Sequence, residues 1–431
     1  MPVSLKTVVI TEGSSIADYA FYGCSNLTNI TIPDSVTKIK GYAFFNCAGL
    51  TNIIIPDSVG EIGNYAFYNC TGLNSINIPG RLTSIGNNAF TGCDAIANIT
   101  VGAGNRVYHS MDNCLIRTAS KILILGCKNS VIPTDGSVTS IGDSAFYGCS
   151  GLTSITIPSS VTSIGKYAFS GCVNLTNIII PNSVTSIGEC VFSGCTSLAS
   201  VTIGYGLTTI SAHTFNGCSN LISITIPSNV YTIDVFAFLN CTSLTEVIMG
   251  SGVGRIEEGA FEGCTRLTSI VIPESVWRIA DLAFAECTSL HSITIPKGVQ
   301  YIAGGAFSKC SSLNSITVAA GNTYYHSAGN CIIETESKTL IIGCKNSVIP
   351  DDGSVTSIGE HAFSGCIGLT SITIPEDVTS IGKFAFYGCQ ELTSITFEGT
   401  VAKWNAISKG YDWNTNVPAT EVVCSDGKVS L

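Results

Sequence analysis

The sequence contains little charge. Of its 431 residues only 12% are Asp, Glu, Lys or Arg, about half the usual share of a globular chain, whereas 45% are hydrophobic. The chain has 20 basic and 30 acidic residues, and the basic residues form no run in the sequence. A net charge of −10 without a basic segment argues against a nucleic-acid partner and against an anionic membrane surface.

Long apolar runs are missing as well. Mean hydropathy is +0.40, but the apolar stretches are about as short as residues 122–125, far below the roughly 18 residues that a transmembrane helix requires. We therefore expect no transmembrane segment. Residues 1–6 also lack the basic and apolar regions of a signal peptide. We expect either a cytosolic protein or a mature or excised part of an exported one, and the repeat pattern that already begins at Leu5 favours the excised part.

Groups suited to catalysis or metal binding are scarce. Only five histidines occur, and none has a nearby carboxylate and nucleophile in the sequence. Cysteines never form the Cys-x2-Cys clusters typical of metal sites. No glycine-rich phosphate loop is present, because the glycines recur at turn positions. The sequence therefore predicts no enzyme, no catalytic residues, no metal site and no cofactor.

A repeat accounts for most of the chain. Fourteen cysteines close a Phe-x-x-Cys motif, and eleven of the thirteen gaps between them are 23 residues long, while the other two are 56. These cysteines are Cys24, Cys47, Cys70, Cys93, Cys149, Cys172, Cys195, Cys218, Cys241, Cys264, Cys287, Cys310, Cys366 and Cys389. Such a constant period predicts a solenoid.

Each part of the repeat has a structural interpretation, seen well in residues 152–172. Leu-x-x-Ile-x-Ile predicts a short strand that ends at Pro, and Val-x-x-Ile-Gly predicts a second extended piece. Ala-Phe-x-x-Cys places three side chains on one face of a helical turn. Because no single coil can bury its inward side chains alone, neighbouring coils must stack. We expect a repeat solenoid over residues 1–400, mostly β with short helical turns and 23-residue coils.

The repeat resembles the BspA-like, or treponemal-class, leucine-rich repeat, written LxxIxIPxxVxxIGxxAFxxC, from about Leu5 to Phe397. Local departures are Gly204, Gly250, Val191, Thr214 and Ala303. The resemblance implies a leucine-rich-repeat fold and a secreted or cell-surface bacterial protein. It also implies adhesion to host matrix proteins or to other cells.

The two 56-residue gaps are copies of one another at an offset of 217 residues. We expect a β-hairpin insert in each, within residues 102–136 and 319–353, with one turn near Ala119. A Tyr-His-Ser motif recurs in both inserts, and it either packs the base of the hairpin or binds a ligand. Residues 401–431 depart from the repeat, and we expect them to form a C-terminal cap in which Trp404 and Trp413 cover the last coil.

The repeated cysteines are expected to be reduced packing residues, because stacked side chains with parallel Cβ vectors fit disulfide geometry poorly. In the inserts the cysteines could instead form disulfide bonds, and the two candidate pairs are Cys114 with Cys127 and Cys331 with Cys344.

Six aromatic residues provide the candidate binding site. In the first three coils two rings flank Ala-Phe, and residues three apart on a helical turn share a face, so the rings should form a stripe along one edge. The six are Tyr19, Tyr22, Tyr42, Phe45, Tyr65 and Tyr68. They either bind a protein or glycan or only shield the edge of the coils.

The function that we predict is a non-enzymatic, secreted or cell-surface binding scaffold, adhesin-like, for a host or cell-surface protein or glycan. We expect a monomer. Two alternatives stay open: a passive spacer, and the accessory repeat region of a larger secreted enzyme.

Overall fold

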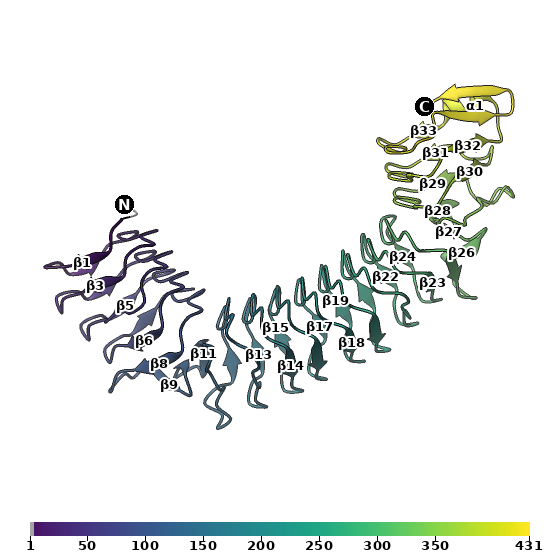
Figure 1. The fold of residues 1–431 in the computed structure, drawn as a ribbon. Helices are drawn as coiled ribbons and strands as arrows, with labels where there is room; N and C mark the ends of the chain where they lie inside the picture. Colours follow the sequence, from purple (N-terminus) through teal and green to yellow (C-terminus); the bar gives the residue numbers. More distant parts are fainter. Residues whose placement is uncertain (1–3) are drawn as a thin grey trace. The chain divides into compact units, whose positions relative to one another are not determined.

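The computed structural model describes residues 4–431. The chain divides into two compact units, Met1–Leu207 and Thr208–Leu431. In each unit successive coils stack, and each coil contributes a strand from its Leu-x-x-Ile-x-Ile segment, a two-residue strand from its Val-x-x-Ile segment, or both (Figure 1). The predicted solenoid of 23-residue coils is therefore confirmed, and α1 (Val401–Ala406) is the one α-helix among residues 4–431.

The first unit contains β1 to β16. Its Leu-x-x-Ile-x-Ile segments form β1 (Thr7–Val9), β3 (Asn29–Thr31), β6 (Ser75–Ile78), β8 (Asn98–Val101), β14 (Asn177–Ile180) and β16 (Ser200–Ile203). Its Val-x-x-Ile segments form β2 (Ser15–Ile16), β4 (Lys38–Ile39), β5 (Glu61–Ile62), β7 (Ser84–Ile85), β12 (Ser140–Ile141), β13 (Ser163–Ile164) and β15 (Ser186–Ile187). The first insert forms β9 (Tyr108–Met111), β10 (Cys114–Arg117) and β11 (Ile122–Leu125).

The second unit contains β17 to β35. Its first-segment strands are β18 (Ser223–Ile226), β20 (Glu246–Met249), β23 (Ser292–Ile295), β25 (Ser315–Val318), β30 (Ser371–Ile374) and β32 (Ser394–Phe397). Its second-segment strands are β17 (Thr209–Ile210), β19 (Thr232–Ile233), β21 (Arg255–Ile256), β22 (Arg278–Ile279), β24 (Tyr301–Ile302), β29 (Ser357–Ile358) and β31 (Ser380–Ile381). The second insert forms β26 (Tyr325–Ala328), β27 (Cys331–Glu334) and β28 (Thr339–Ile342), and the tail adds β33 (Ser408–Lys409), β34 (Glu421–Cys424) and β35 (Gly427–Ser430).

The coils pair in parallel and in register. Ser140 of β12 lies opposite Ser163 of β13, which in turn lies opposite Ser186 of β15. The isoleucine that follows each serine points inward, as Ile164 does, and is buried. Because a strand alternates its side chains between two faces, the repeat places one ladder of isoleucines inside and one ladder of small hydroxyls outside.

The Ala-Phe-x-x-Cys segment differs from the expected helical turn. Its alternate N–H groups donate to the next coil: Phe44 N–H to the Ala66 carbonyl at 2.7 Å, and Asn46 N–H to the Tyr68 carbonyl at 2.8 Å. Tyr42 and Asn46 adopt positive φ angles of 57°. Since these N–H groups bond between coils instead of within one coil, the segment forms a series of turns and no α-helix.

A ladder of phenylalanines fills the core. Phe169 stacks between Phe146 and Phe192, with ring centroids 5.0 and 5.4 Å away. The repeated cysteine does more than fill space, because Cys195 donates its thiol to the Phe169 carbonyl at 3.2 Å, and burial raises the pKa of this thiol to about 12. All twenty cysteines are free, so the candidate disulfides of the inserts are not formed in this structure.

Each insert is a three-stranded antiparallel meander. β10 pairs with β11 at the predicted hairpin, and β9, which the sequence did not predict, pairs with the other side of β10. Tyr108 is buried, and its hydroxyl accepts the Ile85 N–H at 3.1 Å, while His109 Nδ1 lies 2.9 Å from the Thr118 hydroxyl. The second insert repeats both contacts, including the Ile302 N–H bond to Tyr325 at 2.9 Å. The tyrosine of the Tyr-His-Ser motif therefore joins the insert to the preceding coil, whereas the histidine contacts a threonine of the same insert.

Residues 401–431 add one irregular coil and then an antiparallel strand. β33 and β34 extend the two strand rows in parallel with β31 and β32, and β35 pairs antiparallel with β34. Trp404 is 2% exposed, and its ring centroid lies 5.4 Å from that of Phe397 and 5.9 Å from that of Trp413. Both tryptophans thus belong to the core at this end of the array.

Candidate functional site

The six predicted residues lie together along one edge of the first three coils. We call them the aromatic edge. Tyr19, Tyr42 and Tyr65 form one stack, with ring centroids 4.8 and 5.0 Å apart. The other three form a second stack with separations of 4.9 Å: Tyr22, Phe45 and Tyr68. The structure therefore brings all six candidate residues into one surface feature.

Stacking determines which parts of these rings a partner can reach. Tyr19 is 55% exposed and Tyr22 is also exposed, whereas the four rings behind them are half-buried. Because neighbouring rings cover each other's faces, the aromatic edge presents mainly ring edges and hydroxyl groups. Desolvation, followed by the neighbouring phenols of Tyr19 and Tyr65, raises the pKa of Tyr42, so the Tyr42 hydroxyl remains a protonated donor at neutral pH.

The backbone at the first stack carries a conformational cost. Tyr19, Tyr42 and Tyr65 have φ angles between 56° and 60°, and an L-residue in this region costs about 1–2 kcal/mol. Each stacked ring pair contributes about 0.5–1.5 kcal/mol of stabilisation. The two terms are similar in size. The same φ occurs at this position in coils without a ring, such as those of Ser144 and Leu282, so this backbone belongs to the repeat, and edge shielding remains an alternative role for these rings.

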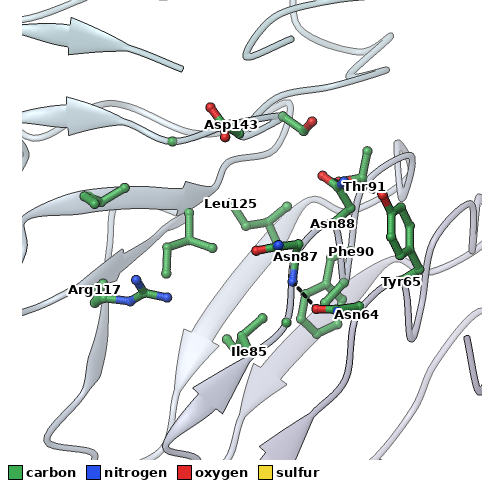
Figure 2. A pocket seen from close by; sticks show the side chains of 16 residues that line it. Asn64, Tyr65, Ile85, Asn87, Asn88, Phe90, Thr91, Arg117, Leu125 and Asp143 are labelled. Carbon is green, nitrogen blue, oxygen red and sulfur yellow. Dashed lines mark hydrogen bonds between the residues drawn. The ribbon is translucent and has the colours of Figure 1, made fainter. Parts of the chain in front are cut away.

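A pocket of about 350 Å³ lies at the end of the aromatic edge (Figure 2). Tyr65 and Asn88 form one rim, where the Asn88 side-chain amide donates to the Tyr65 hydroxyl at 3.2 Å. Asp143 of the next coil and Arg117 of the first insert line the pocket across from Asn87 and Asn88. The pocket therefore places amide, carboxylate and guanidinium groups beside aromatic and aliphatic side chains.

The second insert shows why this pocket exists. The residues equivalent to Asn87 and Asn88 there, 217 positions later, are Gly304 and Gly305. A Cβ atom on Gly304 would lie 2.3 Å from the Glu360 carbonyl oxygen, so the flanking coils come into contact at that point. The asparagine side chains at the first insert do not fit such a contact, and the coils there leave an opening.

The region offers hydrogen-bonding and apolar groups. No group of three or more His, Cys, Asp or Glu residues within residues 4–431 could hold a metal ion. Also within residues 4–431, no helix is long and apolar enough to cross a membrane. Hydroxyls and amides at the aromatic edge and the pocket can donate and accept hydrogen bonds, while the rings supply apolar contact.

Cys190 occupies the row of Tyr167 and His213 on the turns of neighbouring coils. It is one of two cysteines that are not fully buried. Desolvation is the largest cause that raises the pKa of its thiol, while a hydrogen bond with Tyr167 lowers it. The raised pKa does not favour a reactive thiolate at neutral pH.

A family model described as the BspA type leucine rich repeat region matches residues 2–117, 125–244, 208–332 and 338–408. The chain belongs to the BspA-type leucine-rich repeat family. A search of curated proteins finds no match to it.

Solved structures agree with this family. A leucine-rich repeat protein from Eubacterium ventriosum is 28% identical, with a TM-score of 0.58 over 65% of this chain and 82% of its own. One from Bacteroides ovatus is 25% identical, with a TM-score of 0.51 over 91% of this chain and 83% of its own. A leucine rich cell surface protein from Faecalibacterium prausnitzii is 30% identical over 73% of this chain and 88% of its own, with a TM-score of 0.49. The BspA-type array of this chain thus shares its fold with leucine-rich repeat proteins of bacteria.

Proposed function

We propose that this chain is a non-enzymatic, adhesin-like binding scaffold, secreted or held at a cell surface, that recognises a protein or glycan. Membership in the BspA-type family supports this role, because the resemblance of the repeats implies adhesion at bacterial surfaces. The observation that carries the proposal is the continuity of the aromatic edge with the pocket at Tyr65.

The contact surface would combine two kinds of group. Tyr19 and Tyr22 contribute the most exposed rings, which offer apolar area with a hydroxyl at the tip. The pocket contributes the amides of Asn87 and Asn88 together with Arg117. A few polar groups beside apolar walls are typical of pockets that fix the orientation of a ligand.

The test is binding of the purified chain to a panel of matrix proteins and host glycans. A Tyr19→Ser/Tyr42→Ser/Tyr65→Ser variant should bind its ligand about tenfold more weakly or worse, because it removes a whole stack of rings. Tyr167→Ser is the matched control, since Tyr167 is exposed and has a positive φ at the same position of a later coil.

A second variant tests the pocket without touching a ring. Asn87→Gly/Asn88→Gly copies the glycine pair of the second insert, so it should remove amide contacts while remaining compatible with the fold. Weaker binding in both variants would support the proposal. Binding that survives in both, or no binding to any member of the panel, would refute it, and the second outcome would favour a passive spacer.

A further inference from the structure

The repeats supply their own consensus for each position. Several coils depart from it at one pair of positions, and four consecutive coils carry arginines and large rings there. In six coils the two residues before the inward isoleucine of the Val-x-x-Ile segment, or of Leu-x-x-Ile at Leu82, are Thr-Ser. The isoleucines of these six segments are Ile85, Ile141, Ile164, Ile187, Ile358 and Ile381. Four consecutive coils of the second unit replace this pair by Tyr231-Thr232, Gly254-Arg255, Trp277-Arg278 and Gln300-Tyr301. In a chain with 12% charged residues, arginines and large rings gathered on one outward face need an explanation.

The rings of two different coils are joined across this face. The Trp277 indole N–H donates to the Tyr231 hydroxyl at 2.9 Å, although 46 residues separate them. Gly254 lies on the coil between them, and a Cβ atom there would be 2.4 Å from the Tyr231 ring. The missing side chain of Gly254 therefore provides the space in which the tyrosine ring lies.

One buried carboxylate holds two guanidinium groups beside these rings. Glu257 Oε2 accepts from Arg278 Nε at 3.2 Å, and Glu257 Oε1 lies 2.5 Å from Arg255 Nη2. Arg278 Cζ lies 4.7 Å from the centre of the Tyr301 ring, and Arg255 Cζ lies 5.8 Å from that of Trp277. Two positive charges share one negative charge, so the group retains one positive charge in excess.

These side chains remain accessible. Tyr231 and Tyr301 are 49% and 44% exposed, and the side chains of Arg255 and Arg278 are 41% and 30% exposed. Arg278 bonds to Glu257 through Nε, so that bond does not use its terminal amino groups. Preformed and partly free guanidinium donors are suited to carboxylate or sulfate groups.

We propose that Tyr231, Arg255, Trp277, Arg278 and Tyr301, which we call the aromatic–arginine cluster, bind a saccharide that carries carboxylate or sulfate groups. The C–H face of a sugar ring packs on an aromatic ring, while the guanidinium groups donate to the anionic substituent. The four registered residues from Thr232 to Tyr301 span about 14 Å across successive strands. The face is therefore long enough for a short oligosaccharide.

The local backbone favours a saccharide over an acidic peptide. β19, β21 and β22 each pair with a strand on both sides. β24 pairs only with β22, but its two N–H groups already donate to the Trp277 carbonyl and to the Tyr325 hydroxyl. The strands of this face therefore leave no N–H group free for an added peptide strand. This site is separate from the aromatic edge, which belongs to the first unit. It does not depend on the function proposed above.

The experiment measures binding of the full chain to heparin, polygalacturonate, uncharged dextran and poly-glutamate at low and high salt. Polygalacturonate carries carboxylates alone, whereas heparin carries sulfates as well as carboxylates, so binding of heparin without binding of polygalacturonate would indicate recognition of sulfate. Trp277→Thr/Arg278→Ser restores the Thr-Ser pair of the other coils and leaves Glu257 paired with Arg255, so the variant should fold. It should bind the acidic saccharide about tenfold more weakly or worse, because a ring and a charge-assisted contact are lost.

Two controls locate the effect. Ser186→Ala changes an exposed residue of the same row in the first unit and should leave binding unchanged. The triple tyrosine variant of the aromatic edge should also bind acidic saccharides normally, which separates failure of this inference from failure of the proposed function. Binding of poly-glutamate that is equally tight and equally sensitive to the double variant would overturn the saccharide in favour of an acidic peptide. Equal binding of dextran, or binding of none of the four polymers, would also overturn the proposal.

Discussion

Removing one ring from the phenylalanine ladder should destabilise its surroundings strongly. Phe169 is completely buried, and it stacks on rings of both neighbouring coils. A buried Phe→Ala substitution costs about 3–5 kcal/mol, and two lost ring pairs, each worth about 0.5–1.5 kcal/mol, account for part of that cost. With about 4 kcal/mol lost, the local opening constant should rise by roughly a thousandfold.

Native-state hydrogen exchange measured by mass spectrometry is the suitable assay, because coils of a repeat array depend mainly on their nearest neighbours. In Phe169→Ala, amides of residues 146–195 should exchange much faster, whereas those of residues 357–397 in the other unit should keep their protection. Tyr167→Ala removes an exposed ring from the same turn and is the control. A loss below about 1 kcal/mol, or an equal loss of protection in both units, would refute the reasoning.

Three further predictions concern other parts of the chain. Tyr108→Phe removes the acceptor of the buried Ile85 N–H, so the free energy of unfolding should fall by about 1–3 kcal/mol in urea denaturation, and an unchanged value would mean that water replaces the phenol. Trp404→Ala should speed hydrogen exchange of residues 357–424 but not of the first unit. Exchange of residues 357–424 at the same rate as in the unaltered chain would contradict the role of residues 401–431 as a cap. Burial raises the pKa of Cys195 from 9.0 to about 12, so above pH 9 the unfolded chain loses a proton that the folded chain keeps. Stability should therefore fall between about pH 9 and 12, by up to about 1.4 kcal/mol per pH unit for this thiol, and Cys195→Ala should reduce the slope of a pH-dependent denaturation series.

Much of the fold could be predicted because the same pattern of buried apolar residues recurs in every repeat. The inward isoleucines, the Phe-x-x-Cys ladder and the hairpin of each insert follow from local patterns of apolar residues. The turn that carries Phe44 differs from the predicted helical turn, although its apolar spacing fits a helix equally well. Its N–H groups bond to the next coil instead, and spacing within one coil does not reveal a partner in another.

The candidate site, too, could be predicted only in part from the sequence. Sequence spacing predicted that six aromatic residues share one edge, and the structure places them there. The sequence did not show that the rings cover each other's faces, nor that Tyr65 borders a pocket. The aromatic–arginine cluster left a signal in the sequence, because Trp277 and Arg278 replace a Thr-Ser pair, but that signal appears only when each position is compared across coils.

The sequence by itself determined the coil length, the family, the inward ladders and the position of both inserts, because each of these depends on residues within one repeat or on their recurrence. Tertiary structure alone decided what happens between coils. Examples are the thiol bond from Cys195 to the Phe169 carbonyl, the open pocket beside Asn87 as against the closed contact at Gly304, and the pairing of Tyr231 with Trp277. These contacts join residues 23 or more positions apart, and they depend on how closely two backbones approach, which the side-chain pattern of one coil does not specify.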